Sequence, residues 1–183
     1  MARSKFPRIY LAALLFMLSF MPPDKKVKVW LVGDSTCAKK EVKAYPETGW
    51  GMPFSFFFDS SVMVDNRALN GRSTKSFIAE KRWQPVLDSL NSGDYVFIQF
   101  GHNDEVQTKA ASTKPAEFKS NLEKYVSETR SKNALPVLIT PVARRKFDST
   151  GNIVGTHDEY SEIVRTKGCI ISSLVITHVH VNG

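Results

Sequence analysis

The chain has 183 residues, of which 42% are hydrophobic and 23% charged, fractions typical of a folded globular domain. Its formal net charge of +7 falls to +4 when the three basic residues Arg3, Lys5 and Arg8 are left out. The remaining basic residues alternate with acidic ones and form no stripe with aromatic partners, so nucleic-acid binding is not expected. Cys37 and Cys169 lie far apart without metal-ligand spacing, which argues against a zinc site. A disulfide between them stays open, although a buried free thiol at Cys37 is the more common outcome.

Residues 1–21 combine this basic start with an uninterrupted apolar run from Ile9 to Phe20. The pattern is that of a secretory signal peptide, and the apolar run is shorter than the roughly 20 residues of a stable membrane-spanning helix. Pro22 and Pro23 end any helix there, although no small-x-small cleavage site follows. We therefore expect a secreted or periplasmic protein without a stable membrane anchor, a permanent anchor being the alternative.

Short apolar, β-branched runs bounded by turn residues predict four buried strands. They span residues 28–32, 61–64, 95–99 and 137–140. Helical patterns lie between them, at residues 53–58, at 73–90 in two pieces divided at Pro85, and at 115–131. This alternation predicts an α/β protein whose parallel sheet is covered by helices on both faces. No linker rich in proline, glycine or serine divides the chain, so one domain from residue 27 to 165 is expected.

Polar segments follow the first three predicted strands, and they contain Ser35, Gly71 and Asn103. Because the carboxyl ends of parallel strands meet at one edge of a sheet, we expect these segments to lie close together. A serine becomes a nucleophile when a base takes its proton, and the oxyanion formed on an ester needs fixed donors. The backbone N–H groups of Ser35 and Gly71 and the side-chain amide of Asn103 are candidate donors. The alternative is that Gly, Asp and Ser only form turns, as they do at the end of many strands.

Three segments in this order resemble the first three blocks of the SGNH (GDSL-type) hydrolases, namely VGDST, NRALNGRS and FGHND. The flanking segments TGWGMPF and TPVARRKFDSTGNIVGTHDEYSEIVR are similar to the rhamnogalacturonan acetylesterase branch of that family. The resemblance implies a three-layer α/β/α fold with a flavodoxin-like parallel sheet, the last part of which is incomplete here. It also implies that Ser35 is the nucleophile and that Gly71 and Asn103 complete the oxyanion hole.

The same resemblance implies a carbohydrate esterase that removes acetyl groups from acetylated pectic polysaccharide or oligosaccharide, without a metal or organic cofactor. We expect a monomer. Arg144 and Arg145 follow the fourth predicted strand and are candidates for contacts with an anionic uronate chain. A solvated basic loop is the alternative for these residues. A lipase or thioesterase of the same family is the alternative for the activity.

The family's fourth block is an Asp-x-x-His that supplies the base and its orienting carboxylate, and this sequence has no such motif. His178 and His180 lack the aspartate three residues earlier, His102 occupies a variable position of the third block, and His157 is expected to cap or pack against the following helix. The tail at 166–183 is atypical and resembles a truncated or frame-shifted end. Within it, residues 170–181 are expected either to fill a strand position or to remain an exposed edge. We therefore expect impaired catalysis, with a catalytically silent carbohydrate-binding relative as the alternative.

Overall fold

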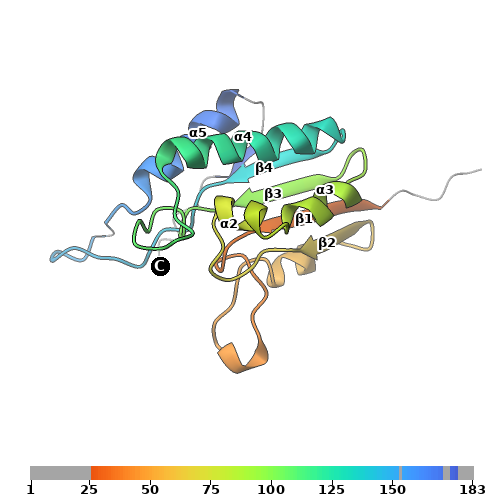
Figure 1. Ribbon diagram of the computed structural model, residues 1–183. Coiled ribbons are helices and arrows are strands. Elements are labelled where there is room, and N and C mark those ends of the chain that lie inside the picture. The colour runs from red at the N-terminus through yellow and green to blue at the C-terminus, as the bar shows by residue number, and fades with distance from the viewer. Residues whose placement is uncertain (1–25, 153, 171–173, 177–183) are drawn as a thin grey trace, which may run out of the picture.

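The computed structural model describes residues 26–152, 154–170 and 174–176. These residues form a five-stranded sheet in the order β2-β1-β3-β4-β5, in which every pairing is parallel (Figure 1). The strands are β1 (Val27–Gly33), β2 (Val62–Asn66), β3 (Tyr95–Gln99), β4 (Leu135–Ile139) and β5 (Leu174–Ile176). The helices are α2 (Thr74–Ala79), α3 (Trp83–Ser89), α4 (Pro115–Ser131) and α5 (Asp158–Ile170), with 3₁₀ helices η1 (Val42–Ala44) and η2 (Pro53–Phe57). The predicted parallel α/β fold is confirmed.

Strand β1 lies inside the sheet, and its alternating side chains enter two different cores. Trp30 is buried in the larger core, to which α2, α3, α4 and α5 all contribute side chains. Val29 lies in the smaller core on the opposite face, where Trp50 and Phe54 pack from the segment that contains η2. Helical segments therefore cover both faces of the sheet, and both cores hold β1 in place so that its carboxyl end is fixed.

The predicted helical stretch at 73–90 is divided at a different place from the one expected. Helix α2 ends at Ala79 and α3 begins at Trp83, with Lys81 between them in the left-handed region at φ 56°. Pro85 lies in the first turn of α3, where a backbone N–H has no helical acceptor and its absence costs little. The prediction of a break at Pro85 was wrong for this reason.

The start of α2 agrees with the sequence pattern. Ser73 is the N-cap, and it forms a capping box with Ser76 in which each side chain accepts from the other residue's backbone N–H. The helix therefore begins with a reciprocal serine cap. Ser73 and Ser76 therefore have a structural role beside the Gly71 turn.

Residues Leu174–Ile176 pair in parallel with β4, so the strand alternative for the tail is confirmed for these three residues. The predicted signal peptide at 1–21 lies outside the described residues. Among the helices that the structure describes, none combines the length and apolar character needed to cross a bilayer.

Cys37 is a free thiol buried in the smaller core. Burial, helped by the nearby Asp34 carboxylate, raises the pKa of this thiol well above its usual range. Because the thiolate is the nucleophilic form, Cys37 is inert at neutral pH in spite of its position two residues after Ser35. The side chain of Cys169 lies outside the described residues.

Candidate active site

The polar segments that follow β1, β2 and β3 meet at the carboxyl edge of the sheet. The backbone N–H of Leu69 donates to the carbonyl of Gly33 at 3.0 Å, which holds the loop after β2 against the end of β1. The Asn103 side-chain nitrogen donates to the Arg72 carbonyl at 2.9 Å and so joins the loop after β3 to the loop after β2. Between these contacts Gly71 has φ +76°, a conformation that favours glycine. The structure therefore brings the segments containing the candidate residues to one place.

Ser35 is half-buried and lines a cavity of about 610 Å³. Most of the wall is apolar and comes from Trp50, Phe54, Phe97, Ile139 and Val142. The Ser35 hydroxyl has no hydrogen-bond partner among the residues that the structure describes. It is therefore available to a ligand in the cavity, and no described side chain is in place to accept its proton.

Gln99, the last residue of β3, connects the walls of this cavity. Its Oε1 accepts from Trp50 Nε1 at 2.7 Å and lies 3.0 Å from Thr36 Oγ1, whose single proton is shared between Gln99 and Asp34. Its Nε2 donates to the Thr140 carbonyl at 3.3 Å. Both flanking segments singled out in the sequence are thus fixed beside the Ser35 loop by one buried amide. Sequence reasoning missed Gln99, because a single polar residue at the end of an apolar strand carries no signal of its partners.

The side chain of Asn103 is held at both ends of its amide. Its Oδ1 accepts from Lys109 Nζ at 2.9 Å, and one of its two N–H donors is used by the Arg72 carbonyl. One N–H donor remains for a ligand. Asn103 is buried, so this donor is held in a fixed direction, as a preorganised oxyanion site requires.

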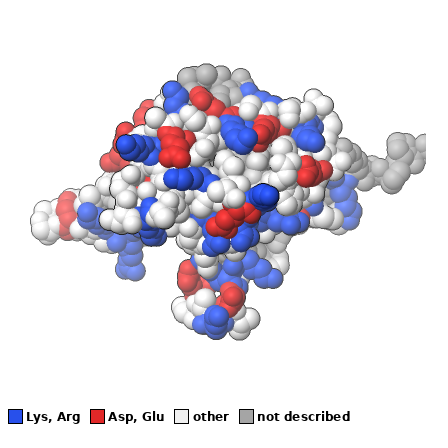
Figure 2. Space-filling view, viewed as in Figure 1, with Lys and Arg blue, Asp and Glu red and all other residues white. Residues whose placement is uncertain are grey.

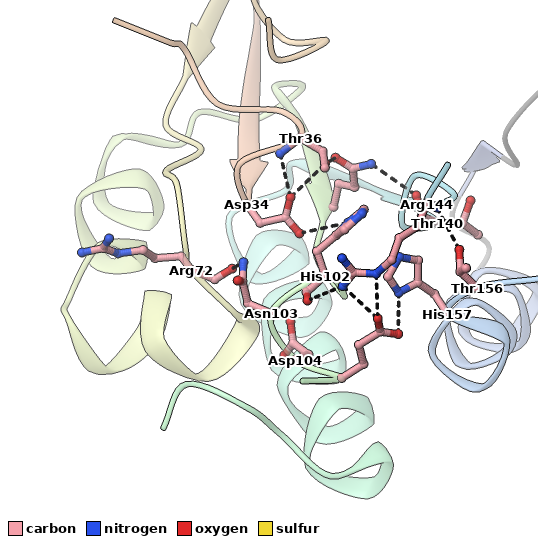
Figure 3. A network of polar contacts seen from close by, with 12 residues as sticks. Asp34, Thr36, Arg72, His102, Asn103, Asp104, Thr140, Arg144, Thr156 and His157 are labelled. Atoms are coloured by element: carbon pink, nitrogen blue, oxygen red, sulfur yellow. Dashed lines mark hydrogen bonds and ion pairs between the residues drawn. The ribbon is translucent and has the colours of Figure 1, made fainter. Parts of the chain in front are cut away.

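A cluster of charged and ionisable side chains lies beside the Ser35 loop (Figure 3). Asp34 is buried, and its Oδ1 accepts from the backbone N–H and the hydroxyl of Thr36 at 2.9 and 2.8 Å. Its other oxygen faces His102 Nδ1 at 4.0 Å. The His102 ring contacts the His157 ring edge-on at a centroid distance of 4.3 Å, and His157 Nδ1 lies 2.5 Å from Glu105 Oε2. None of these contacts was predicted, since they depend on side-chain directions in three separate segments.

Two further predicted residues lie in the segment after β4. Arg144 Nη2 forms an ion pair with Glu105 Oε1 at 2.9 Å, and this carboxylate orients the guanidinium of Arg144. Arg145, next to it, is exposed to solvent. His157 lies at the start of α5, where its carbonyl accepts from Ser161 N–H at 2.7 Å, which confirms the expected capping position.

Asp104, directly after Asn103 in the loop that follows β3, is buried against the first residue of α2. Its Oδ1 accepts from Thr74 N–H at 3.1 Å, from Thr74 Oγ1 at 2.6 Å and from Thr113 Oγ1 at 2.9 Å. Burial raises the pKa of Asp104 to about 6, although the hydrogen bonds from these donors oppose the rise. Asp104 thus binds the first backbone N–H of α2 from outside the helix.

This raised pKa predicts that Asp104 makes stability depend on pH. The folded protein binds a proton on Asp104 below pH 6, whereas the unfolded chain does so only below its ordinary value of 3.8. The stabilisation is therefore complete below pH 3.8 and is lost as pH rises through 6, by about 3 kcal/mol in total. We expect Asp104→Asn to remove this slope, as measured by urea unfolding at pH 4 and pH 7. An equal difference between the two pH values in both proteins would contradict the assignment.

Basic and acidic side chains are interspersed on the face of the molecule shown in Figure 2. No cluster of a single sign marks an interface for a polyanion on this face. Within the described ranges, no three His, Cys, Asp or Glu side chains are arranged to hold a metal ion.

A serine loop at the carboxyl end of an inner strand of a parallel sheet, next to loops with fixed amide donors, defines an α/β protein of hydrolase type. Residues 31–168 match the GDSL-like Lipase/Acylhydrolase family, and the chain belongs to this family.

The relatives are similar over part of their length. Rhamnogalacturonan acetylesterase RhgT of Bacillus subtilis is 40% identical over 142 residues, which make up 77% of this chain and 60% of that protein. A rhamnogalacturonan acetylesterase of Emericella nidulans is 42% identical over 91 residues, or 49% of this chain and 34% of that protein. The crystal structure of the Bacillus subtilis protein YxiM superposes with a TM-score of 0.74 at 23% identity, covering 82% of this chain and 43% of that one. The fold is therefore shared, and the chain spans about 60% or less of the length of these relatives.

Proposed function

We propose that this chain carries the esterase site of a carbohydrate acetylesterase, with Ser35 as nucleophile and acetylated pectic polysaccharide as substrate. The observation that carries the proposal is a half-buried serine hydroxyl, without a partner among the described residues, in a cavity beside two loops with amide donors. The 40% identity to RhgT supports the substrate class. The basic and apolar N-terminal segment supports secretion or export to the periplasm.

In the proposed reaction, Ser35 Oγ attacks the carbonyl carbon of the acetyl ester, and its proton passes to a base, which returns it to the leaving sugar oxygen. No described side chain is in place for the role of this base. The negative charge on the carbonyl oxygen is stabilised by the backbone N–H groups of Ser35 and Gly71 and by the remaining N–H of Asn103. Collapse of this intermediate releases the sugar hydroxyl and leaves an acetyl-serine. Water then cleaves the acetyl-serine to acetate and restores the serine.

A second candidate function is carbohydrate binding without turnover. The observation that favours it is the Ser35 hydroxyl, which no described histidine contacts. Serine hydrolases that lose one member of the triad keep roughly 10³ to 10⁴ of rate over water. We therefore expect slow acetate release under the first function and none under the second.

The test is acetate release from acetylated rhamnogalacturonan, run beside labelling with a fluorophosphonate and mapping of the label by mass spectrometry. The esterase proposal expects acetate above the spontaneous rate and a label on the peptide containing Ser35. Acetylated xylan and a 4-nitrophenyl octanoate ester are run in parallel, and faster hydrolysis of the octanoate would favour the lipase alternative. Binding of pectic fragments with neither label nor acetate would favour the silent relative and overturn the esterase proposal.

A further inference from the structure

Five side chains beside the proposed nucleophile form what we name the histidine cluster, namely Asp34, His102, Glu105, Arg144 and His157 (Figure 3). They come from four places in the chain: the end of β1, the loop after β3, the segment after β4 and the start of α5. The cluster is therefore a cross-link between loops at the carboxyl edge of the sheet.

The contact between Asp34 and His102 links the histidine cluster to Ser35, because Asp34 directly precedes Ser35 in the sequence. Asp34 Oδ2 and His102 Nδ1 are both buried, and neither has a hydrogen-bond partner among the residues that the structure describes. They lie 4.0 Å from each other. Because an unpaired buried polar atom is costly, each of these atoms is the natural partner of the other.

The other side of the His102 ring is held by His157. The two rings meet edge to face at an interplanar angle of 60°, and Glu105 fixes His157 through its Nδ1. His157 adopts φ 65°, a strained conformation for a residue with a side chain. Arg144 completes the set, since it bonds both Glu105 and the carbonyl of His102, the latter at 3.1 Å. The ring and the backbone of His102 are thus both positioned.

We propose that His102 is a positioning residue whose Nδ1–H faces the Asp34 carboxylate at 4.0 Å and, by electrostatic attraction, holds the loop of Ser35 against the loop of Asn103. The proposal rests on the proposed esterase function for its activity readout. Asp34 precedes Ser35 and His102 precedes Asn103, so one contact spans the nucleophile loop and the proposed oxyanion loop. A neutral imidazole carries one N–H. When this proton is on Nδ1 of His102, the Nε2 atom takes no part in positioning the two loops.

Protonation of His102 changes the charge of the cluster. Burial lowers the pKa of His102 from its ordinary 6.5, and the positive Arg144 and the neighbouring His157 add to this, while the carboxylates of Asp34 and Glu105 act against it. His102 is therefore neutral at pH 7 and takes up a proton only at a pH below 6.5. The added proton goes to Nε2, so the Nδ1–H that faces Asp34 stays in place in both charge states.

The experiment compares substitutions that imitate one or the other ring nitrogen. His102→Asn places an amide N–H near the position of Nδ1, whereas His102→Gln places it near Nε2. We expect fluorophosphonate labelling of Ser35 to stay near the wild-type rate in His102→Asn at pH 7 and to fall by about 10- to 100-fold in His102→Gln and His102→Ala. Lys132→Ala, which changes an exposed residue at the end of α4, is the control.

Hydrogen exchange of the peptides covering residues 33–38 and 101–105 gives a readout that does not need activity. Exchange should rise in both peptides in His102→Gln and His102→Ala and stay unchanged in His102→Asn. If His102→Gln is active and His102→Asn is not, Nε2 is the functional atom and the proposal is overturned. Equal rates and equal exchange in all variants would also overturn it. Absence of labelling in the wild type would count against the esterase function alone, and the exchange data would then decide the positioning role.

Discussion

Ser35→Ala is expected to abolish fluorophosphonate labelling of this chain completely. Ser35 is the proposed nucleophile and lines the described cavity, so the covalent adduct is expected on its Oγ. Acetate release should fall by a smaller factor, because the roughly 10³ to 10⁴ of rate that binding and the oxyanion hole provide in serine hydrolases does not need the hydroxyl. Labelled protein is measured by intact-mass spectrometry, and acetate by an enzyme-coupled assay.

Ser55→Ala is the matched control for this substitution. Ser55 lies in η2 and is exposed, and it is not part of the wall of the Ser35 cavity. We expect its substitution to leave both readouts unchanged. Persistent labelling of Ser35→Ala on another residue would show that the nucleophile had been assigned wrongly.

Much of the fold was predictable, because local signals and the hydrophobic pattern agree. The bounds of β3 and α4 were predicted to the residue, since turn residues flank the strand and Pro115 begins the helix. The break between α2 and α3 was missed, because a proline in the first helical turn is tolerated and the left-handed Lys81 has no sequence signal. Such local exceptions depend on tertiary packing.

The place of the candidate site was predictable from topology, whereas its internal contacts were not. Parallel strands bring their carboxyl ends together, so the segments of Ser35, Gly71 and Asn103 were expected at one edge. The contact between Asp34 and His102 depends on the direction of two side chains in loops, for which periodicity gives no information. The chemical roles of Ser35, Gly71 and Asn103 stay predictions.

Gly101→Ala is expected to destabilise the protein by about 3 kcal/mol or more. Gly101 has φ +142°, and a Cβ added there would lie 2.3 Å from Pro141 Cγ and 3.0 Å from its Cβ. The rigid proline ring cannot yield as a flexible side chain does, so strain of the backbone adds to a steric clash. Because His102 and Asn103 follow directly, labelling of Ser35 should slow as well. Urea unfolding measures the first effect.

Gly93→Ala separates the cost of backbone strain from the cost of the steric clash with Pro141. Gly93 has φ +87° in the turn before β3, but a Cβ there would meet no atom within 4 Å. Its substitution should therefore cost only the conformational strain of about 1 to 2 kcal/mol. Equal losses at both positions would mean that contact with Pro141 contributes nothing.

The position of β1 between β2 and β3 imposes an order on biosynthesis. The strand nearest the N-terminus cannot gain its second neighbour until Gln99 has left the ribosome, and the side chains of α4 that bury Trp30 follow later still. When synthesis pauses before Pro115, Gln99 still lies inside the ribosome, so β1 is exposed as an apolar strand whose backbone groups on one side are unpaired. Surfaces of this kind are bound by chaperones. Translation speed through the segment between β3 and α4 consequently bears on the yield of soluble protein.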